Sequence, residues 1–463
     1  MNGHAQRLPR EALPWAGACL AAGLAAGVLA GQEHLVAGLG APARWAALAA
    51  LVAAILYRPR LGLWVMLVAA PLNDYGRIVT GPVPVTVFQA ALGASLVAWG
   101  WLLLAGEVRL HRPNRLQLAL VLPFLAALWS LPLSLDPSRT AYGAARLLFL
   151  WLFALIVSYS AEDPRRRERI VEVFVWTGVA LAVVSFAQYA FPGLPVGNTH
   201  LQYDAAGVDV LTRPAAFFLD PNFLAGYLAV ASLVSLVRVV HSSSRREAAL
   251  WAVPTVLCAT AMALTLSRSG LVGFLAGAVA VVLTAPPRRR RAMLVAALLL
   301  AVLAVPVIPE RYVQRVTALG DVMSEGSLAT RFFMVGSTLE IIRDFWGTGT
   351  GLAAFDVAYP SYRRIGALPR ILRPHEVPLA LPAEMGVAGL IAEVALLAAV
   401  LWAFAAARRR GWRVTDAVVL TGVLTLLVQS WFQYYLYFEY LWLFAALAAA
   451  LPAPDAQRGA GRA

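Results

Sequence analysis

Four polar clusters interrupt an otherwise apolar chain, and each contains an arginine or a histidine. They are Arg213-Pro214 with Asp220-Pro221-Asn222, then Ser267-Arg268-Ser269-Gly270, then Arg331 in a basic segment, and finally Arg373-Pro374-His375-Glu376 followed by Glu384-Met385-Gly386. Guanidinium groups bind phosphate oxygens through paired hydrogen bonds and stay charged. A histidine near neutral pH can accept a proton from a hydroxyl. These residue types predict a site for a phosphate-bearing ligand and an incoming hydroxyl.

Each cluster also has a structural interpretation, which stays open at this point. Asp220 and Asn222 are residues that cap a helix N-terminus. Arg268, in a turn between two apolar helices, can extend to lipid headgroups. Facing the helix bundle instead, it would need a partner and would mark a site. His375, before a helix, can equally be a capping or hydrogen-bonding residue.

The ligand that best fits several arginines without matching carboxylates is a diphosphate. Arginine can also stabilise the negative charge that develops on a departing diphosphate. The outer segments contain no D-x-D or E-x-D pair and no His/Cys cluster, so neither a metal nor another cofactor is expected. The phosphate-binding motif GxxxxGK[ST] is absent, so ATP is not expected as an energy source.

The composition predicts an all-α, polytopic integral membrane protein. Of 463 residues, 60% are hydrophobic and only 14% are charged, against about 25% charged in an average soluble domain. A membrane-spanning helix takes roughly 20 apolar residues. An ordinary soluble enzyme, a disordered chain and a disulfide-rich module are therefore excluded. The net charge of +13 comes from arginines, most of them in loops, and no nucleic-acid partner is expected.

Apolar runs between charged or Pro/Gly residues predict about 12–14 spans. The fourteen candidates are 12–31, 43–57, 61–79, 84–105, 116–133, 141–160, 170–191, 216–240, 249–266, 270–285, 292–308, 377–406, 414–433 and 434–452. Pro71, Asn73 and Asp74 interrupt the third, and no clear loop separates the last two.

Arginine in the short loops predicts the orientation. With the N-terminus in the cytoplasm, the inner loops contain 20 arginines and the short outer loops five. Both termini are then cytoplasmic, and all four polar clusters lie at the outer boundary of the membrane.

A basic outer segment, 309–376, departs from this rule, as long loops do. Its arginines are Arg311, Arg315, Arg331, Arg343, Arg363, Arg364, Arg370 and Arg373. Residues 327–345 have the apolar spacing of a helix lying on a membrane surface, and Gly347, Gly349 and Gly351 predict a flexible turn after it. The expected divisions are an N-terminal helix bundle (1–208), a second transmembrane part (209–308), the basic segment and C-terminal helices (377–463).

The motifs R-P-x5-D-P-N-F-L-A-G-Y-L, T-L-S-R-S-G, D-F-W-G-T-G-T-G-L-A-A-F and H-E-x7-E-M-G-V-A-G-L occur in that order over 210–395. Together they resemble the bacterial O-antigen ligase/polymerase superfamily. Two positions depart from the pattern of that family. Asp344 stands where a proline is usual, and Glu376 follows His375 where an asparagine is usual.

The resemblance implies a GT-C-type fold and a metal-independent, inverting glycosyltransferase in the bacterial inner membrane. Such enzymes transfer a glycan from undecaprenyl diphosphate to an acceptor hydroxyl at the periplasmic face. It implies that Arg213 and Arg268 hold the diphosphate and that His375 activates the acceptor. It adds four substrate-binding candidates: Arg331, Arg373, Asn222 and Glu384. Glu384 lies about 13 Å from His375 along a helix, so an orienting role is expected rather than that of a second base.

Three acceptors remain open within the family, and one alternative function lies outside it. A ligase transfers the glycan to lipid A-core, a polymerase transfers it to a second lipid-linked glycan, and a third branch glycosylates protein. Outside the family, a flippase for a lipid-linked anion would also use arginines. A transporter is expected to show related halves or interrupted helices near mid-membrane, with polar groups at several depths. Here the unusual polar residues cluster at one outer face, and the sequence has no evident half-to-half symmetry.

Overall fold

The computed structural model describes residues 41–73, 77–79, 85–107, 113–194, 196–203, 210–291, 293, 326–364, 374 and 377–451. Helices dominate these ranges, and the only strands among them are two short antiparallel pairs. The prediction of an all-α polytopic membrane protein is therefore confirmed. The described residues fall into two compact units, each assembled from separate stretches of the chain.

Every predicted span within the described residues corresponds to a helix or a helix pair. Seven described helices are long and apolar enough to cross a membrane, and five apolar helices are shorter. The seven are Val87–Leu104, Arg115–Leu133, Pro137–Ser160, Pro164–Ala190, Pro221–His241, Arg245–Leu264 and Val377–Arg410. The predicted span 12–31 lies outside the described residues, as does nearly all of 292–308.

The first unit comprises Met1–Leu110, Asp163–Ser235 and Ala249–Ser267. Its elements are α3 (Ala41–Tyr57), α4 (Arg60–Ala69), η1 (Ala70–Leu72), β1 (Arg77–Val79), β2 (Val85–Thr86), α5 (Val87–Leu104), α9 (Pro164–Ala190), β3 (Thr199–Tyr203), β4 (Val210–Pro214) and most of α10 (Pro221–His241) and α11 (Arg245–Leu264).

The predicted span 61–79 is wrong at its C-terminal end. The helical run stops at Leu72, and Arg77–Val79 forms a strand paired with Val85–Thr86. The Asn73 side chain accepts a hydrogen bond from the Thr86 hydroxyl at 2.6 Å. Thr86 in turn caps α5, where the Gln89 N–H donates to its hydroxyl. Asn73 therefore ends its own helical run and supports the residue that caps the next helix, α5.

The core of the first unit is built on α9 and α10. Tyr227 of α10 is fully buried, and its hydroxyl donates to the Phe174 carbonyl of α9 at 2.7 Å. A methyl group at Gly178 would come within 2.8 Å of Ala231. Small residues therefore bring these two helices close together, as is common between helices in membranes.

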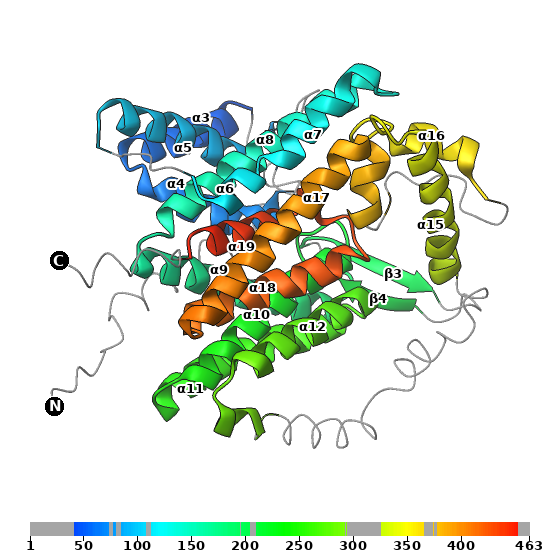
Figure 1. Ribbon diagram of the computed structural model, residues 1–463. Coiled ribbons are helices and arrows are strands. Elements are labelled where there is room, and N and C mark those ends of the chain that lie inside the picture. The colour runs from blue at the N-terminus through cyan, green and yellow to red at the C-terminus, as the bar shows by residue number, and fades with distance from the viewer. Residues whose placement is uncertain are drawn as a thin grey trace. The chain divides into compact units, whose positions relative to one another are not determined.

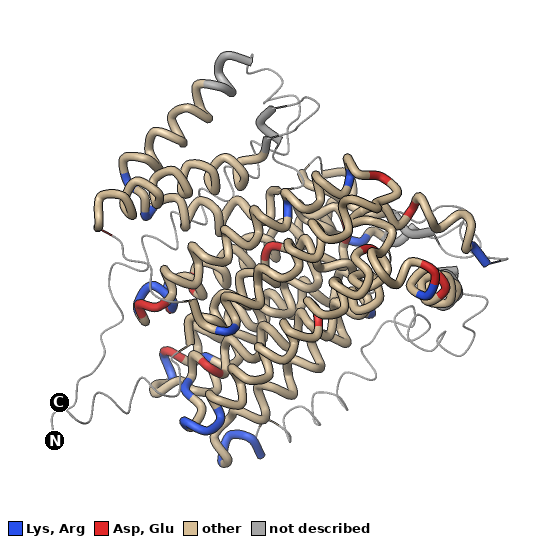
Figure 2. The backbone as a smooth tube through the Cα atoms, turned by 45° about the horizontal axis from the view of Figure 1, so that its top comes forward, with Lys and Arg blue, Asp and Glu red and all other residues tan. Residues whose placement is uncertain are grey.

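The second unit comprises His111–Glu162, Leu236–Ala248 and Arg268–Ala463. Its elements are α6 (Arg115–Ala119), α7 (Leu122–Ser130), η2 (Leu131–Leu133), α8 (Pro137–Ser160), α12 (Arg268–Thr284), α15 (Gly326–Asp344), α16 (Phe355–Tyr362), α17 (Val377–Arg410), α18 (Val414–Ser430), η4 (Tyr435–Tyr437) and α19 (Glu439–Ala449). Helix α12 runs alongside α18 (Figure 1). Charged residues gather mainly near helix ends, and most of each long helix is uncharged (Figure 2).

Helix α17 is not the continuous span predicted for 377–406. Gly386 has φ 59° and ψ −147°, which breaks the helical backbone. This region of backbone space is strongly unfavourable for residues with a side chain. The structure therefore contains an interrupted helix, a feature that the sequence did not show.

Candidate functional site

The hairpin β3–β4 carries Arg213 in the first unit, and its base is anchored on the C-terminal turn of α9. The Gln188 side chain accepts from the Ala216 N–H at 3.0 Å and donates to the Val196 carbonyl at 2.6 Å. Gly197, at φ 70°, lies against the Ala216 carbonyl, where a Cβ would come within 2.0 Å. Only glycine fits this close approach. Gly197 therefore helps to hold the base of the hairpin, next to Arg213, against the end of α9.

Arg213 lies at the centre of a hydrogen-bonded cluster. Its Nε donates to the Thr265 carbonyl at 2.8 Å, and its Nη2 donates to Asn222 Oδ1 at 3.3 Å. Ser267 Oγ donates to the same Asn222 oxygen at 2.7 Å. We refer to Arg213, Asn222, Thr265 and Ser267 as the Arg213 cluster. It joins the first two predicted motifs and orients the guanidinium between the hairpin, the start of α10 and the end of α11.

The capping prediction for the first motif is confirmed for Asp220 but not for Asn222, which lies inside α10. Asp220 precedes α10, and its Oδ1 accepts from the Asn222 N–H at 2.7 Å. Asn222 thereby presents its own side-chain oxygen to Arg213 and Ser267. The predicted turn of the second motif is also present: Leu266 has φ 53° between α11 and α12, and Arg268 is the first residue of α12.

His200 is a residue near Arg213 that the sequence reasoning missed. It is the cross-strand partner of Arg213 in the β3–β4 ladder. Its Nε2 lies 2.6 Å from the Leu219 carbonyl oxygen, and the residue is exposed. No motif surrounds His200 in the sequence. The antiparallel pairing of Thr199–Tyr203 with Val210–Pro214 would have been the signal, and the short strands lie between stronger apolar patterns.

The glycine-rich segment 347–351 in the second unit was predicted as a flexible turn. In the structure it is a turn that is hydrogen-bonded to the break in α17. Thr350 N–H donates to the Ala383 carbonyl at 3.0 Å, and Gly351 N–H donates to the Glu384 carbonyl at 2.9 Å. Val387 N–H donates to the Trp346 carbonyl at 2.8 Å. At the break, the carbonyls of Ala383 and Glu384 and the N–H of Val387 lose their partners within the helix. Backbone groups of the glycine turn form hydrogen bonds with them instead.

The same turn is also held from the side of α7 and α8. Trp129 Nε1 donates to the Gly347 carbonyl at 3.1 Å, and Leu135 N–H donates to the Thr350 carbonyl at 2.9 Å. Arg139, in the first turn of α8, forms a two-fold contact with the Asp356 carboxylate at 2.8 and 2.9 Å. The turn is therefore held by α17 on one side and by α7 and α8 on the other.

Glu384 is fully buried beside this turn. The Tyr434 hydroxyl donates to its Oε2 at 2.7 Å, from the segment just before η4. A buried carboxyl with a tyrosine partner and a backbone carbonyl on the glycine turn is placed to orient neighbouring groups. Its predicted orienting role is compatible with this arrangement and stays a proposal.

Arg146, inside the predicted span 141–160, was given no role from the sequence. It lies within α8, and its guanidinium carbon is 4.4 Å from the centre of the Tyr437 ring. Tyr437 in turn lies 5.8 Å from Tyr434, centre to centre. An aromatic face attracts a cation, and no carboxylate among the described residues pairs with Arg146. An arginine within an apolar helix was itself a signal for a site.

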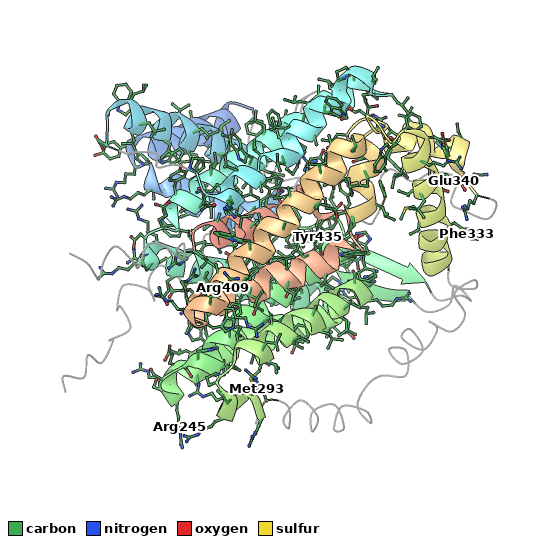
Figure 3. The ribbon with its side chains drawn as sticks, viewed as in Figure 1. Arg245, Met293, Phe333, Glu340, Arg409 and Tyr435 are labelled. Carbon is green, nitrogen blue, oxygen red and sulfur yellow. The ribbon has the colours of Figure 1, made fainter. Side chains whose placement is uncertain are left out.

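Carboxylates of α15 neutralise two of the arginines in the basic segment. Arg364 pairs with Glu340 of α15 at 2.7 Å, and Arg343 Nε donates to Asp344 at 2.9 Å. Figure 3 shows Glu340 on α15. The helix predicted for 327–345 is confirmed as α15.

Asp344, the last residue of α15, links α15 to α16. Its second oxygen accepts from the Tyr362 hydroxyl at 3.0 Å. The hydrogen bonds from Arg343 and then from Tyr362 hold the pKa of the Asp344 carboxyl below its ordinary value. Because the folded state favours the ionised carboxylate, these bonds contribute to the stability of the folded state above the ordinary carboxyl pKa. This contribution is lost as the pH falls through the lowered value.

Three predicted residues have no described side chain. His375 and Arg373 lie outside the described residues, and Arg331 belongs to α15 without its side chain being described. Among the residues that are described, no three His, Cys, Asp or Glu side chains gather as metal ligands would. The structure therefore brings together Arg213 and Asn222 in one unit, and places Glu384 beside the glycine turn in the other.

Comparison with known proteins adds one finding. Residues 253–393 match the family model described as O-antigen ligase. The match runs from α11 through α12, α15 and α16 to Gly386 and the residues just after it, so it contains Thr265, Ser267, Arg268 and Glu384. No curated protein matches the chain significantly.

Proposed function

We propose, from the premise that residues 253–393 place this membrane protein in the O-antigen ligase superfamily, that it transfers a glycan from undecaprenyl diphosphate to an acceptor hydroxyl. The preferred acceptor is lipid A-core. This would make the chain an O-antigen ligase of the bacterial inner membrane, with its site at the periplasmic face and both termini in the cytoplasm. The arginine distribution supports that orientation.

The Arg213 cluster carries the proposal. The Arg213 guanidinium is already oriented by a main-chain carbonyl and an asparagine side chain. It therefore loses little further conformational entropy when it binds a phosphate. In the transfer, the acceptor oxygen bonds to the anomeric carbon while the bond from that carbon to the diphosphate oxygen breaks. Negative charge grows on the departing diphosphate, and fixed positive charge lowers the energy of that transition state.

Further residues are assigned from the family motifs and from the geometry. Arg268 and Arg331 are proposed to share the diphosphate with Arg213. Asn222 would orient Arg213 from the start of α10, and its hydrogen bond to Nη2 supports this role.

The acceptor side of the reaction is assigned to the fourth motif. His375 is proposed to take the proton of the acceptor hydroxyl, and Arg373 to bind an acidic group of the acceptor. Glu384 would orient this region, because its backbone is tied to the glycine turn and its side chain to Tyr434. No metal or cofactor is needed for this scheme.

A polymerase that uses a second lipid-linked glycan as acceptor remains the alternative within the family. A flippase remains the alternative of another class, and the interrupted helix at Gly386 is the observation that favours keeping it. The freed backbone groups of that break are, however, paired with the glycine turn, which supports a fixed structural joint.

The test is a transfer assay with the full chain in proteoliposomes. Undecaprenyl-diphosphate-linked glycan is offered with lipid A-core or with a second lipid-linked glycan. A single addition to lipid A-core supports the ligase, and a ladder of lengthening lipid-linked products supports the polymerase. Arg213→Ala should lose activity, whereas Arg245→Ala, at an exposed arginine at the start of α11 (Figure 3), should keep it. Movement of intact donor across the membrane without transfer would instead identify a flippase.

A further inference from the structure

His200 and Arg213 face each other across the β3–β4 ladder. Residues directly opposite in an antiparallel pair have Cβ atoms about 4.5–5.5 Å apart and project from the same face of the sheet. The hairpin thus carries the imidazole of His200 and the guanidinium of Arg213 on the same face. The exposure of His200 leaves room for a ligand at this face.

The contact with Leu219 fixes how the imidazole is protonated. A carbonyl oxygen only accepts hydrogen bonds, so Nε2, at 2.6 Å from it, carries a hydrogen. In the neutral ring Nδ1 then holds a lone pair and can accept but not donate. Nδ1 becomes a donor only when the ring takes up a second proton.

In the described part of this unit, one charged residue is paired with His200 and another follows the residue that His200 contacts. Arg213 faces it from β4, and Asp220 follows Leu219 directly at the start of α10. An anion that binds here adds negative charge beside both His200 and Arg213, and negative charge favours the protonated form of an imidazole. Protonation of His200 is therefore expected to accompany anion binding.

We propose that His200 is a proton-dependent phosphate ligand beside Arg213. The protonated ring donates from Nδ1 to a phosphate oxygen of the lipid-linked donor, while Nε2 keeps its bond to Leu219. This assignment rests on the proposed function, because it names a second ligand for the same diphosphate. It makes donor binding, and not only the chemical step, sensitive to pH.

The donor itself does not titrate near neutral pH, so a pH dependence of donor binding must come from the protein. A glycan-linked polyprenyl diphosphate is a diester, so neither phosphate takes up a proton near neutral pH. Among protein side chains, histidine is the one that ordinarily changes charge between about pH 5 and 8. A binding step that takes up one proton weakens by up to about tenfold for each pH unit above the titration of the free ring.

The experiment measures binding of a polyprenyl diphosphate carrying one N-acetylglucosamine to the full chain in nanodiscs, from pH 5.5 to 8.5. Wild-type Kd should rise with pH. His200→Gln, whose side chain can still donate to Leu219, should bind at every pH about as weakly as wild type at pH 8.5. His200→Arg, with a fixed charge, should bind with a Kd independent of pH. Arg213→Gln should raise Kd throughout and keep the pH dependence.

The outcomes separate this inference from the proposed function. If His200→Gln keeps the wild-type pH dependence, His200 is not the proton-dependent ligand, although the donor assignment stands. The same holds if wild-type Kd does not change with pH. If wild type does not bind this donor at any pH, both the ligand role of His200 and the proposed donor are overturned.

Discussion

Gly349 offers the sharpest test of the joint between the glycine turn and α17. It has φ 73°, and a Cβ at this position would lie 2.3 Å from the Glu384 carbonyl carbon and 2.4 Å from the Met385 nitrogen. These are backbone atoms, so no side-chain rotation can relieve the contact. Gly349→Ala must therefore displace either the turn or the start of the break at Gly386.

The expected cost has two parts. Holding an alanine in a left-handed conformation costs about 1–2 kcal/mol, and forcing an extra carbon into a packed region costs about 1–3 kcal/mol. The sum is about 2–5 kcal/mol. On a scale of about 2–4 °C per kcal/mol for larger domains, the apparent Tm should fall by roughly 4–20 °C.

Gly347→Ala is the matched control in the same turn. A Cβ there meets no atom within 4 Å, and Gly347 is not among the glycines with positive φ. Its effect should stay within about 0.5 kcal/mol, as for ordinary surface changes. Thermal unfolding of both variants, followed by intrinsic fluorescence in detergent, provides the comparison. Equal Tm values for Gly349→Ala, Gly347→Ala and wild type would refute the close packing of Gly349 on Glu384.

Four other outcomes are expected. His375→Ala should abolish glycan transfer while donor binding and Tm stay at wild-type values; transfer at the wild-type rate would remove His375 from the chemistry. Arg268→Lys should lose nearly as much transfer activity as Arg268→Ala, because an ammonium cannot make the paired contact of a guanidinium, and full activity with lysine would indicate generic charge. Tyr434→Phe should destabilise the protein by about 1–3 kcal/mol, since Glu384 loses a buried hydrogen bond; an unchanged Tm would argue against that bond. Transfer should continue in EDTA, and inhibition by the chelator would contradict a metal-independent reaction.

The sequence predicted the helices well because each apolar run is long enough to need a membrane or a buried environment. Its errors fall where tertiary contacts decide the backbone. The run 61–79 ends at Leu72 because Asn73 bonds to Thr86 thirteen residues later. The run 377–406 breaks at Gly386 because the turn at Gly349 supplies the missing hydrogen bonds. Neither contact leaves a periodic pattern in the sequence.

The candidate site was predictable in its residue types and less so in its contacts. Arg213 and Asn222 stood out because they belong to one polar motif, R-P-x5-D-P-N, that directly precedes a long apolar run, and the structure brings them together. His200 was missed because its role depends on strand register, which a five-residue strand specifies weakly. Arg146 lies inside a predicted span, and its contact with the Tyr437 ring joins segments about 290 residues apart, which the sequence alone does not show.

The central claim is that the chain breaks the bond between a glycan and a lipid diphosphate. The most direct measurement is the release of undecaprenyl diphosphate by proteoliposomes that contain the full chain, with and without lipid A-core. The proposed function predicts one equivalent released for each glycan joined to lipid A-core, no release without an acceptor, and no release by Arg213→Ala. Recovery of intact donor from wild-type proteoliposomes, with every tested acceptor present, would contradict it.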